Sequence, residues 1–162
     1  MFNVAIITAS DKGAQGERED ISGQTIRKML EGQGLVRHYR VVPDDKEVLI
    51  REMKYAADEV GVDLILTTGG TGLSVRDVTP EATLAVIERQ VPGIPEGMRM
   101  KSLEITAKAM LSRAVAGTRG STLIINLPGS PKGAAECLAV VLPIIEHGVA
   151  ILKGEASECA RS

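Results

Sequence analysis

The residues best suited to chemistry lie in one segment, "LTTGGTGLSVRDVTPEAT", at positions 66–83. Its glycines, Gly69, Gly70 and Gly72, can adopt positive φ and expose backbone N–H groups, which lets a loop wrap a phosphate or a flat polar ring. Thr67, Thr68 and Thr71 add short hydroxyl donors. The segment has neither the Gly-Lys-Ser/Thr end of a Walker loop nor a G-x-G-x-x-G fingerprint. It predicts a ligand-binding loop of another kind or, as the alternative, a tight strand-to-helix turn.

Charged side chains near this loop could complete an anion site. Asp77 follows the loop closely, and Asp44 follows an earlier apolar stretch. Two carboxylates beside a phosphate loop would suit Mg²⁺, which takes few protein carboxylates and shares its substrate's phosphate oxygens. Arg76 and Lys132 could add charge-assisted hydrogen bonds, because a helix N-terminus alone contributes only about 0.3–1 kcal/mol toward an anion. The alternative is that the acids, Glu81 included, only cap helices and that the cations are solvated.

Strands and helices that alternate along the chain must position these residues. Apolar runs predict buried strands over residues 3–9, 63–68 and 121–128, and residues 35–43 resemble a further strand. The first helix is predicted from Asp20 or Ser22 to near Gly32 or Gly34, and the second from Asp44 or Asp45 to Ala57. Further helices are predicted from an N-cap at Thr79 to residue 90, over 94–110, and over 129–154 as one broken helix or two successive helices interrupted at Pro143. This order predicts a single domain over residues 1–162, a three-layer α/β/α sandwich with a mostly parallel central sheet.

The unusual loops all follow predicted strands. Ser10 and Asp11 come after the first strand, Asp44 after the second, the glycine loop after the third and "NLPGSPK" after the last. In such sheets ligands bind beyond the carboxyl ends of the strands. We therefore expect one cavity to collect these loops, with contributions from the last one by Asn126, Pro128, Gly129 and Ser130.

Composition excludes several classes of function. A net charge of -2 over 162 residues and an aromatic content of 2% argue against a nucleic-acid binder, which needs a basic footprint or stacking platforms. Cys137 and Cys159 are far from any C-x-x-C pattern, and with His38 and His147 as the only histidines no zinc set can be assembled. The first residues, "MFNVAIITAS", lack a basic region and a long apolar run. We expect a cytoplasmic protein without a membrane anchor.

The strings "TTGGTG", "RDVTPEAT" and "NLPGSPK", together with "SDKGAQGEREDISG" near the start, resemble the Mog/MoaB family of molybdenum cofactor biosynthesis proteins. The resemblance covers essentially the whole chain in order, and includes the stand-alone molybdopterin adenylyltransferases and the matching domain of gephyrin. The front segment is more similar to the Mog branch, through Ser10, Asp11, Gly16, Asp20, Ser22 and Gly23. A CinA protein would be expected to read closer to "GLGPTxDD" at the glycine segment.

The resemblance implies an enzyme that transfers AMP from Mg-ATP to the terminal phosphate of molybdopterin and releases pyrophosphate. It gives Asp44 and Asp77 the placement of Mg²⁺ and of the ATP phosphates. Nucleotide or pterin binding would fall to the two loops and their neighbours, that is Ser10, Asp11, Thr68 to Gly72, Arg76, Glu81, Asn126 to Ser130, and Lys132. It also implies a homotrimer or a dimer of trimers, and hand-over of the product to a MoeA-type insertase.

Other functions remain open from the sequence. A protein of the same fold could bind molybdopterin without catalysis, a CinA-like protein would hydrolyse nucleotides without a pterin, and an interaction module would do neither. Pyrophosphate release from molybdopterin and Mg-ATP separates the enzyme from the non-catalytic binder. Turnover of dinucleotide or NMN-type substrates would mark the CinA-like protein, and the interaction module would show no nucleotide-dependent thermal stabilisation and no preference for Mg²⁺. The sequence also leaves open molybdenum against tungsten, ATP against GTP, and which loop takes the pterin.

Overall fold

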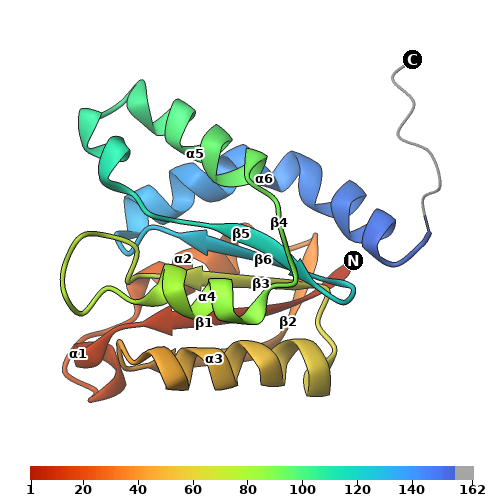
Figure 1. Cartoon of the computed structure of the whole chain (residues 1–162), viewed down its shortest axis with the longest axis horizontal. Coiled ribbons are helices and arrows are strands. Elements are labelled where there is room, and N and C mark those ends of the chain that lie inside the picture. Colours follow the sequence, from red (N-terminus) through yellow and green to blue (C-terminus); the bar gives the residue numbers. More distant parts are fainter. Residues whose placement is uncertain (156–162) are drawn as a thin grey trace.

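A six-stranded sheet forms the centre of the protein, for which a computed structural model describes residues 1–155 (Figure 1). Its strands lie in the order β2-β1-β3-β6-β5-β4. The first four in this order are parallel, and β5 pairs antiparallel with both β6 and β4. The strands are β1 (Phe2–Ala9), β2 (Gly34–Val42), β3 (Leu64–Thr68), β4 (Arg89–Gln90), β5 (Ala116–Arg119) and β6 (Thr122–Leu127).

Helices cover both faces of this sheet, which confirms the predicted three-layer fold. One face is packed by α2, α5 and α6, and the other by α3 and α4. Figure 1 shows α5 and α6 above the sheet and α3 below it, with α4 drawn in front of the strands. The helical segments are α1 (Asp11–Ala14), α2 (Ile21–Met29), α3 (Lys46–Lys54) with its π-helical extension η1 (Tyr55–Val60), α4 (Thr79–Val86), α5 (Gly93–Leu103), the 3-10 turn η2 (Ala107–Leu111) and α6 (Pro131–Leu152).

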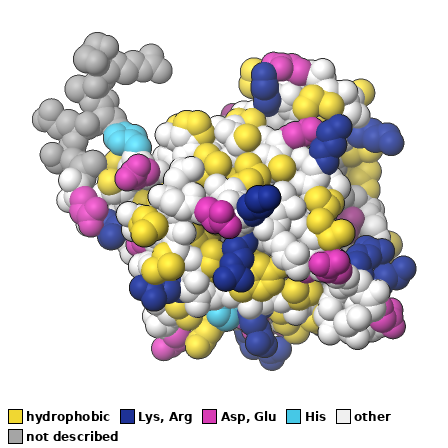
Figure 2. Space-filling model, turned by 180° about the vertical axis from the view of Figure 1, so that it is seen from behind, with side chains coloured by type: hydrophobic (Ala, Val, Ile, Leu, Met, Phe, Trp, Pro, Cys, Tyr) yellow, Lys and Arg dark blue, Asp and Glu magenta, His cyan; other side chains and the backbone are white. Residues whose placement is uncertain are grey.

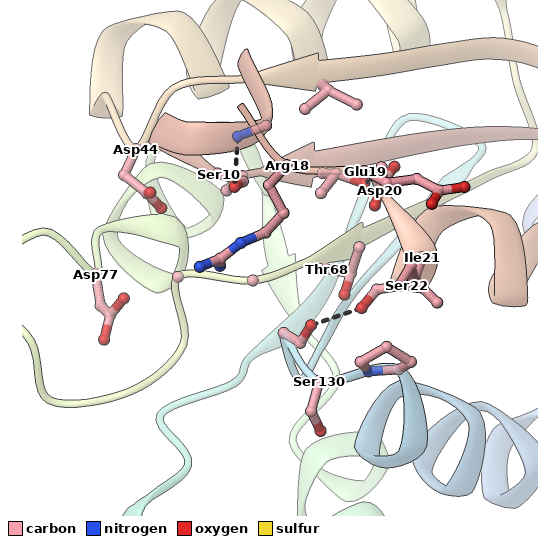
Figure 3. A pocket seen from close by; sticks show the side chains of 18 residues that line it. Ser10, Arg18, Glu19, Asp20, Ile21, Ser22, Asp44, Thr68, Asp77 and Ser130 are labelled. Carbon is pink, nitrogen blue, oxygen red and sulfur yellow. Dashed lines mark hydrogen bonds between the residues drawn. The ribbon is translucent and has the colours of Figure 1, made fainter. Parts of the chain in front are cut away.

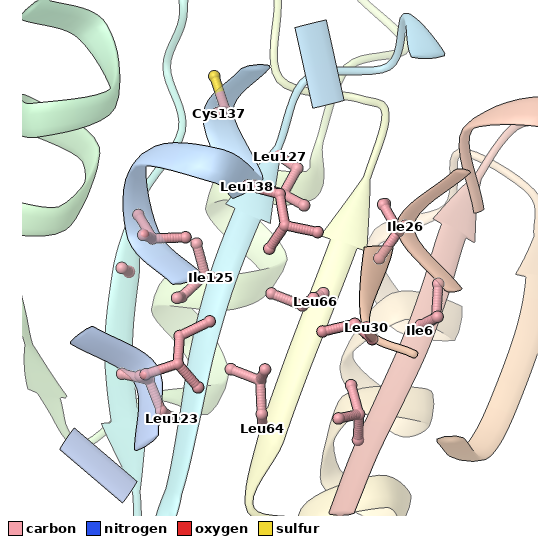
Figure 4. Close-up of a cluster of buried hydrophobic side chains, with 14 of the residues drawn as sticks. Ile6, Ile26, Leu30, Leu64, Leu66, Leu123, Ile125, Leu127, Cys137 and Leu138 are labelled. Carbon is pink, nitrogen blue, oxygen red and sulfur yellow. The ribbon is translucent and has the colours of Figure 1, made fainter. Parts of the chain in front are cut away.

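Aliphatic side chains fill the spaces between the layers, as the shortage of aromatic residues requires. Successive strand residues point to opposite faces. Val4 and Ile6 of β1 therefore join the cluster under α2 and α6 (Figure 4), whereas Ala5 and Ile7 face α3 and α4. Full burial of a Val, Leu or Ile side chain contributes roughly 1.5–3 kcal/mol. These contacts hold β1 and its neighbours in the middle of the sheet, where their carboxyl ends position the loops.

The antiparallel edge of the sheet differs from the prediction. The helix predicted to end at residue 90 ends at Val86, and Arg89–Gln90 instead forms β4. Neither β4 nor β5 was predicted, because strands of two and four residues are too short to show an alternating pattern. Gly117 permits their pairing, since a Cβ at this position would collide with the carbonyl oxygen of Arg89.

Two helix boundaries also differ. The helix predicted over 94–110 is divided, because α5 ends at Leu103 and η2 starts afresh after Thr106, whose hydroxyl accepts a hydrogen bond from the backbone N–H of Lys108. In contrast, α6 runs unbroken through Pro143, where a break was predicted. Pro143 and Ala139, whose carbonyl loses its helical partner, are both exposed. Water can therefore satisfy that carbonyl while the buried side of the helix remains packed.

By length and composition, α6 is the one helix among residues 1–155 that could cross a membrane. Its apolar character also has an explanation within the fold. Leu138, Val141 and Ile145 lie at helical spacing and are buried against the sheet.

Basic, acidic and apolar side chains are interspersed on the face seen in Figure 2, without one sign of charge gathering over it. This pattern agrees with the net charge of -2. Proteins that neutralise many nucleic-acid phosphates instead carry clustered Lys and Arg.

Candidate functional site

A cavity of about 630 Å³ lies beyond the carboxyl ends of β1 and β3 (Figure 3). The sheet order reverses here, since β1 has β2 on one side and β3 on the other. Such a switch point opens a crevice where parallel sheets bind ligands. The loops after β1, β2, β3 and β6 all reach this cavity, with Ser10, Asp44, Gly69 and Ser130 among its lining residues. We call it the polar cavity.

The glycine loop forms one wall of the polar cavity and is held by hydrogen bonds. Gly69 and Gly70 have φ of 93° and 69°, and a Cβ on them would collide with the Ala9 carbonyl and the Thr79 hydroxyl, respectively. The Thr79 hydroxyl donates to the Gly69 carbonyl oxygen at 2.9 Å, and the Thr68 hydroxyl donates to the Pro128 carbonyl oxygen at 2.6 Å. Thr79 was predicted as an N-cap, but it is the first helical residue and Val78 is the N-cap. Its hydroxyl therefore holds the glycine loop through the Gly69 carbonyl and does not cap α4.

Two carboxylates, Asp44 and Asp77, line the polar cavity together (Figure 3). The cap of α3 is Asp45, which leaves Asp44 available to face the cavity. One oxygen of each is held by a backbone N–H: Asp44 Oδ2 accepts from Asp11 at 3.1 Å, and Asp77 Oδ2 accepts from Ser74 at 3.0 Å.

The second oxygen of each carboxylate, Oδ1, accepts no hydrogen bond from the residues that the structure describes. Burial raises the pKa of Asp44, and the nearby charges of Asp11 and Asp77 raise it further, while the hydrogen bond from Asp11 acts in the opposite direction. A divalent cation would relieve this repulsion. The pair of free oxygens therefore fits Mg²⁺, which coordinates few protein carboxylates.

Several predicted ligand contacts are engaged with other protein groups. Arg76 donates from Nε and an Nη to the two oxygens of Asp11, at 3.0 and 2.8 Å, and this pairing lowers the pKa of Asp11. Asp11 Oδ1 also accepts from the backbone N–H of Asp44 at 3.0 Å. Glu81 forms an ion pair with Arg113. Asp11, Arg76 and Glu81 do not line the cavity; they tie its loops together.

Asn126 is fully buried and also lies outside the cavity. Its amide donates to the hydroxyls of Thr67 and Thr83, at 2.9 Å each, and its Oδ1 accepts from the backbone of Val115. The structure therefore gives its side chain a role in joining β6 to its neighbours. Lys132 is exposed on the first turn of α6 and lines neither of the cavities described in this section.

Arg18 is a cavity residue that the sequence analysis did not single out. Figure 3 shows its side chain extending into the polar cavity, between the acids on one side and Thr68 and Ser22 on the other. It forms no ion pair or hydrogen bond with the other described residues. The nearby Asp20 is occupied, since it accepts from Thr8 at 2.8 Å, from the backbone of Gly23 and from the Tyr39 hydroxyl. Arg18 thus brings a free positive charge to this cavity.

A second cavity, of about 310 Å³, adjoins the polar one across the loops after β3 and β6. Ser130 lines both cavities, whereas Thr71, Gly72 and Pro128 line only the second. Its other walls come from α5, η2, α6 and the segment before β5. They include the apolar residues Pro95, Met98, Ala109, Leu111, Ala114 and Cys137, and the charged residues Arg99, Lys108 and Glu136. We call it the apolar cavity. Burial raises the pKa of the Cys137 thiol, so a thiolate is disfavoured there. Cys159 lies outside the described residues.

Comparison with known proteins identifies the family. Residues 5–147 match the model described as a probable molybdopterin binding domain. The chain belongs to this family. It is 42% identical to a molybdopterin adenylyltransferase of Helicobacter pylori J99, over 94% of this chain and 89% of that protein. A molybdopterin biosynthesis enzyme MoaB from Thermus thermophilus has a TM-score of 0.91 and 50% identity, over 98% of this chain and all of that one.

Structures from both branches of the family match this molecule. The Mog protein from Mycobacterium ulcerans has a TM-score of 0.87 and 37% identity, over 94% of this chain and 99% of that one. The family match thus does not separate Mog from MoaB. A CinA protein from Thermoplasma acidophilum has a TM-score of 0.69 but only 20% identity, over 88% of this chain and 97% of that one, so the likeness there extends to the fold alone.

Proposed function

We propose that this protein is a molybdopterin adenylyltransferase, a nucleotidyltransferase of molybdenum cofactor biosynthesis. It transfers AMP from ATP to the terminal phosphate of molybdopterin and releases pyrophosphate. The observation that carries the proposal is the pair Asp44 and Asp77, each with one free oxygen, in a cavity that the glycine loop also lines. Relatives named for this activity match almost the whole chain.

In this proposal the polar cavity takes ATP. Backbone groups of Gly69 and Gly70 line the cavity, and the free guanidinium of Arg18 pairs with phosphate oxygens. Asp44 and Asp77 would hold Mg²⁺ through their free oxygens. Bound there, the ion would neutralise charge on the phosphates and favour departure of pyrophosphate.

The adjoining apolar cavity suits the flat pterin. Most of its lining surface is apolar, and its boundary with the polar cavity runs through Ser130. A pterin placed there could extend its phosphate across this boundary. An oxygen of that phosphate would attack the α-phosphorus of ATP, and the bond from the α-phosphorus to the bridging oxygen of pyrophosphate would break. No protein nucleophile is needed, so positioning and charge stabilisation account for the catalysis.

The proposal includes an assembly and a place in the pathway. Large apolar side chains are exposed on the 73–75 loop and around α5 and η2, among them Leu73, Val75, Met100, Met110 and Leu111. Such surfaces support contacts between copies in a homotrimer or a dimer of trimers. Light scattering of the purified protein tests this. The adenylylated product would pass to a MoeA-type insertase, and ATP as co-substrate agrees with a cytoplasmic location.

A reaction with purified molybdopterin, ATP and Mg²⁺ tests the function. We expect pyrophosphate and adenylylated molybdopterin in equal amounts, detected by a coupled assay and by mass spectrometry. A non-catalytic binding protein would retain molybdopterin without releasing pyrophosphate. A CinA-like hydrolase would turn over nucleotides without molybdopterin. Either outcome would contradict the proposal.

A further inference from the structure

We infer that Arg113 is a positioning residue that fixes Asp77 in the polar cavity; its catalytic consequence rests on the proposed function. Arg113 lies in the segment between η2 and β5 and does not line the polar cavity, which Asp77 does line. Its Nε donates to the Gly72 carbonyl oxygen at 2.7 Å, and one Nη donates to the Asp77 carbonyl oxygen at 2.8 Å. The other Nη pairs with the Glu81 carboxylate, and its backbone N–H donates to the Thr71 carbonyl oxygen at 2.9 Å. Arg113 thus contacts the start and the end of the loop over residues 72–77, and also the first turn of α4, which follows this loop.

The Asp77 loop, residues 72–77, cannot hold this shape by packing. Leu73 and Val75 are 66% and 96% exposed, so they bury little apolar surface. Its internal hydrogen bonds link Ser74 and Asp77 to each other and not to the body of the protein. The tie through Arg76 to Asp11 is largely exposed, and solvent weakens such pairs. The Arg113 side chain is only 33% exposed and bonds to the backbone directly.

Arg113 also joins the two cavities. Thr71 and Gly72, whose carbonyls it binds, line the apolar cavity, and so do its sequence neighbours Ser112 and Ala114. The same guanidinium binds Asp77, which lines the polar cavity. A molecule that fills the apolar cavity would contact the segments that Arg113 holds together. Occupation of the apolar cavity should therefore tighten the placement of Asp77.

Amide hydrogen exchange tests the positioning without any catalysis. In Arg113→Gln we expect faster exchange across residues 72–77 than in the wild type. The matched control is Arg119→Gln, because Arg119 makes a similar set of bonds, to both oxygens of Asp58 and to the Val86 carbonyl. Arg119 lies in β5 and lines neither cavity, so its variant should leave residues 72–77 unchanged. Equal exchange of this loop in the two variants would overturn the inference.

Kinetics then test whether the positioning matters for the reaction. A misplacement of about 1 Å can cost on the order of 100-fold in rate, so kcat of Arg113→Gln should fall by about that factor. The Mg²⁺ concentration for half-maximal rate should rise as well. Arg113→Lys should rescue little, because an ammonium cannot reproduce the forked donors of a guanidinium. Arg119→Gln should keep wild-type kcat and Mg²⁺ dependence even where it lowers the melting temperature.

The test must also cover a variant that does not fold and a wild type that lacks the proposed activity. Should Arg113→Gln not fold, as judged by circular dichroism, Glu81→Gln takes its place. It removes only the half-exposed carboxylate and should give a smaller change of the same sign in loop exchange. Wild-type protein without pyrophosphate release would overturn the proposed function, while loop exchange would still decide the role of Arg113. Full activity in Arg113→Gln, beside an active wild type, would refute the catalytic consequence of this positioning.

Discussion

The two cavities are built in different ways. The polar cavity is made mainly by loops that follow parallel strands, and its acids and glycines stand in short recognisable strings. The apolar cavity is made by side chains from α5, η2 and α6 that meet only in the fold. The acids and glycines of the polar cavity are therefore visible in the sequence, although Arg18 is not. The surfaces that hold a ring, and the residues that hold the acids in place, depend on packing.

The largest expected effect is on the acids of the polar cavity. Asp77→Ala should lower kcat about 1,000-fold, the upper range for loss of one group that stabilises transition-state charge. Molybdopterin binding should remain, because Asp77 does not line the apolar cavity. Pyrophosphate release and a molybdopterin binding titration measure the two effects. Full ATP turnover in this variant would show that Asp77 does not hold the metal.

The matched control for Asp77→Ala is Asp45→Ala, which removes the carboxylate next to Asp44. Asp45 caps α3 by accepting from the backbone of Val48 at 3.0 Å. Loss of this cap should cost about 1 kcal/mol of stability. Because Asp45 does not line the polar cavity, kcat should stay near that of the wild type.

A second prediction concerns the glycine loop. Gly70→Ala should lower kcat/KM about 100-fold, because the new Cβ would displace the Thr79 hydroxyl and press on Asp44. Gly61→Ala is the control, since Gly61 also has positive φ, of 71°, but has open space around it. Both variants carry backbone strain of about 1–3 kcal/mol, so their melting temperatures should fall. Only Gly70→Ala should lose activity; equal kinetics in both would show that the loop contacts no substrate.

A third prediction separates the two cavities by their substrates. Arg18→Gln should raise KM for ATP about tenfold, the equivalent of roughly 1.4 kcal/mol and near the value of one charge-assisted hydrogen bond. Ser102→Leu, which fills part of the apolar cavity, should raise KM for molybdopterin and leave KM for ATP unchanged. Steady-state kinetics with each substrate varied in turn provide the test. The opposite pattern would exchange the assignments of the two cavities.

The smallest effects are on stability. The raised pKa of Asp44 means that the folded protein gains stability as this group becomes protonated and loses it as pH rises through the folded pKa. Asp44→Asn should therefore be more stable than the wild type at neutral pH, and this advantage should fade as pH falls through the folded pKa of Asp44. Thermal melts over a pH series check it.

Asp11→Asn should behave in the opposite sense. Arg76 lowers the pKa of Asp11, so the stabilisation is present above the ordinary Asp range and is lost as pH falls through the folded value. This variant should be less stable than the wild type at neutral pH and equal to it in strong acid. Parallel pH profiles for both variants would contradict the electrostatic description of the site.

The parallel part of the fold could be predicted from the sequence, since β1, β3 and β6 are apolar runs and polar or glycine-rich loops follow them. The two short antiparallel strands could not, because they have no periodic pattern of their own. The break predicted at Pro143 was wrong, because the free energy gained by packing the buried face of α6 exceeds the cost of one lost backbone hydrogen bond.

The candidate site shows the same limit. Convergence of the loops at one edge of the sheet could be predicted because each loop follows a predicted strand. The hydrogen-bond partners of individual side chains could not be predicted. Asn126 and Glu81 have the residue types of ligand contacts, yet their hydrogen bonds are to protein groups. Arg18 and Arg113 look alike in the sequence, and only the fold shows that one is free in a cavity and the other holds a loop.

The most direct test is a crystal structure with Mn²⁺ in place of Mg²⁺ and an ATP analogue that cannot release pyrophosphate. We predict an anomalous peak between Asp44 and Asp77, bonded to both carboxylates and to phosphate oxygens, with Arg18 against the phosphates. Coordination distances should be near the roughly 2.1 Å expected of Mg²⁺ sites. A metal bound elsewhere, or phosphates outside the polar cavity, would contradict the proposed chemistry.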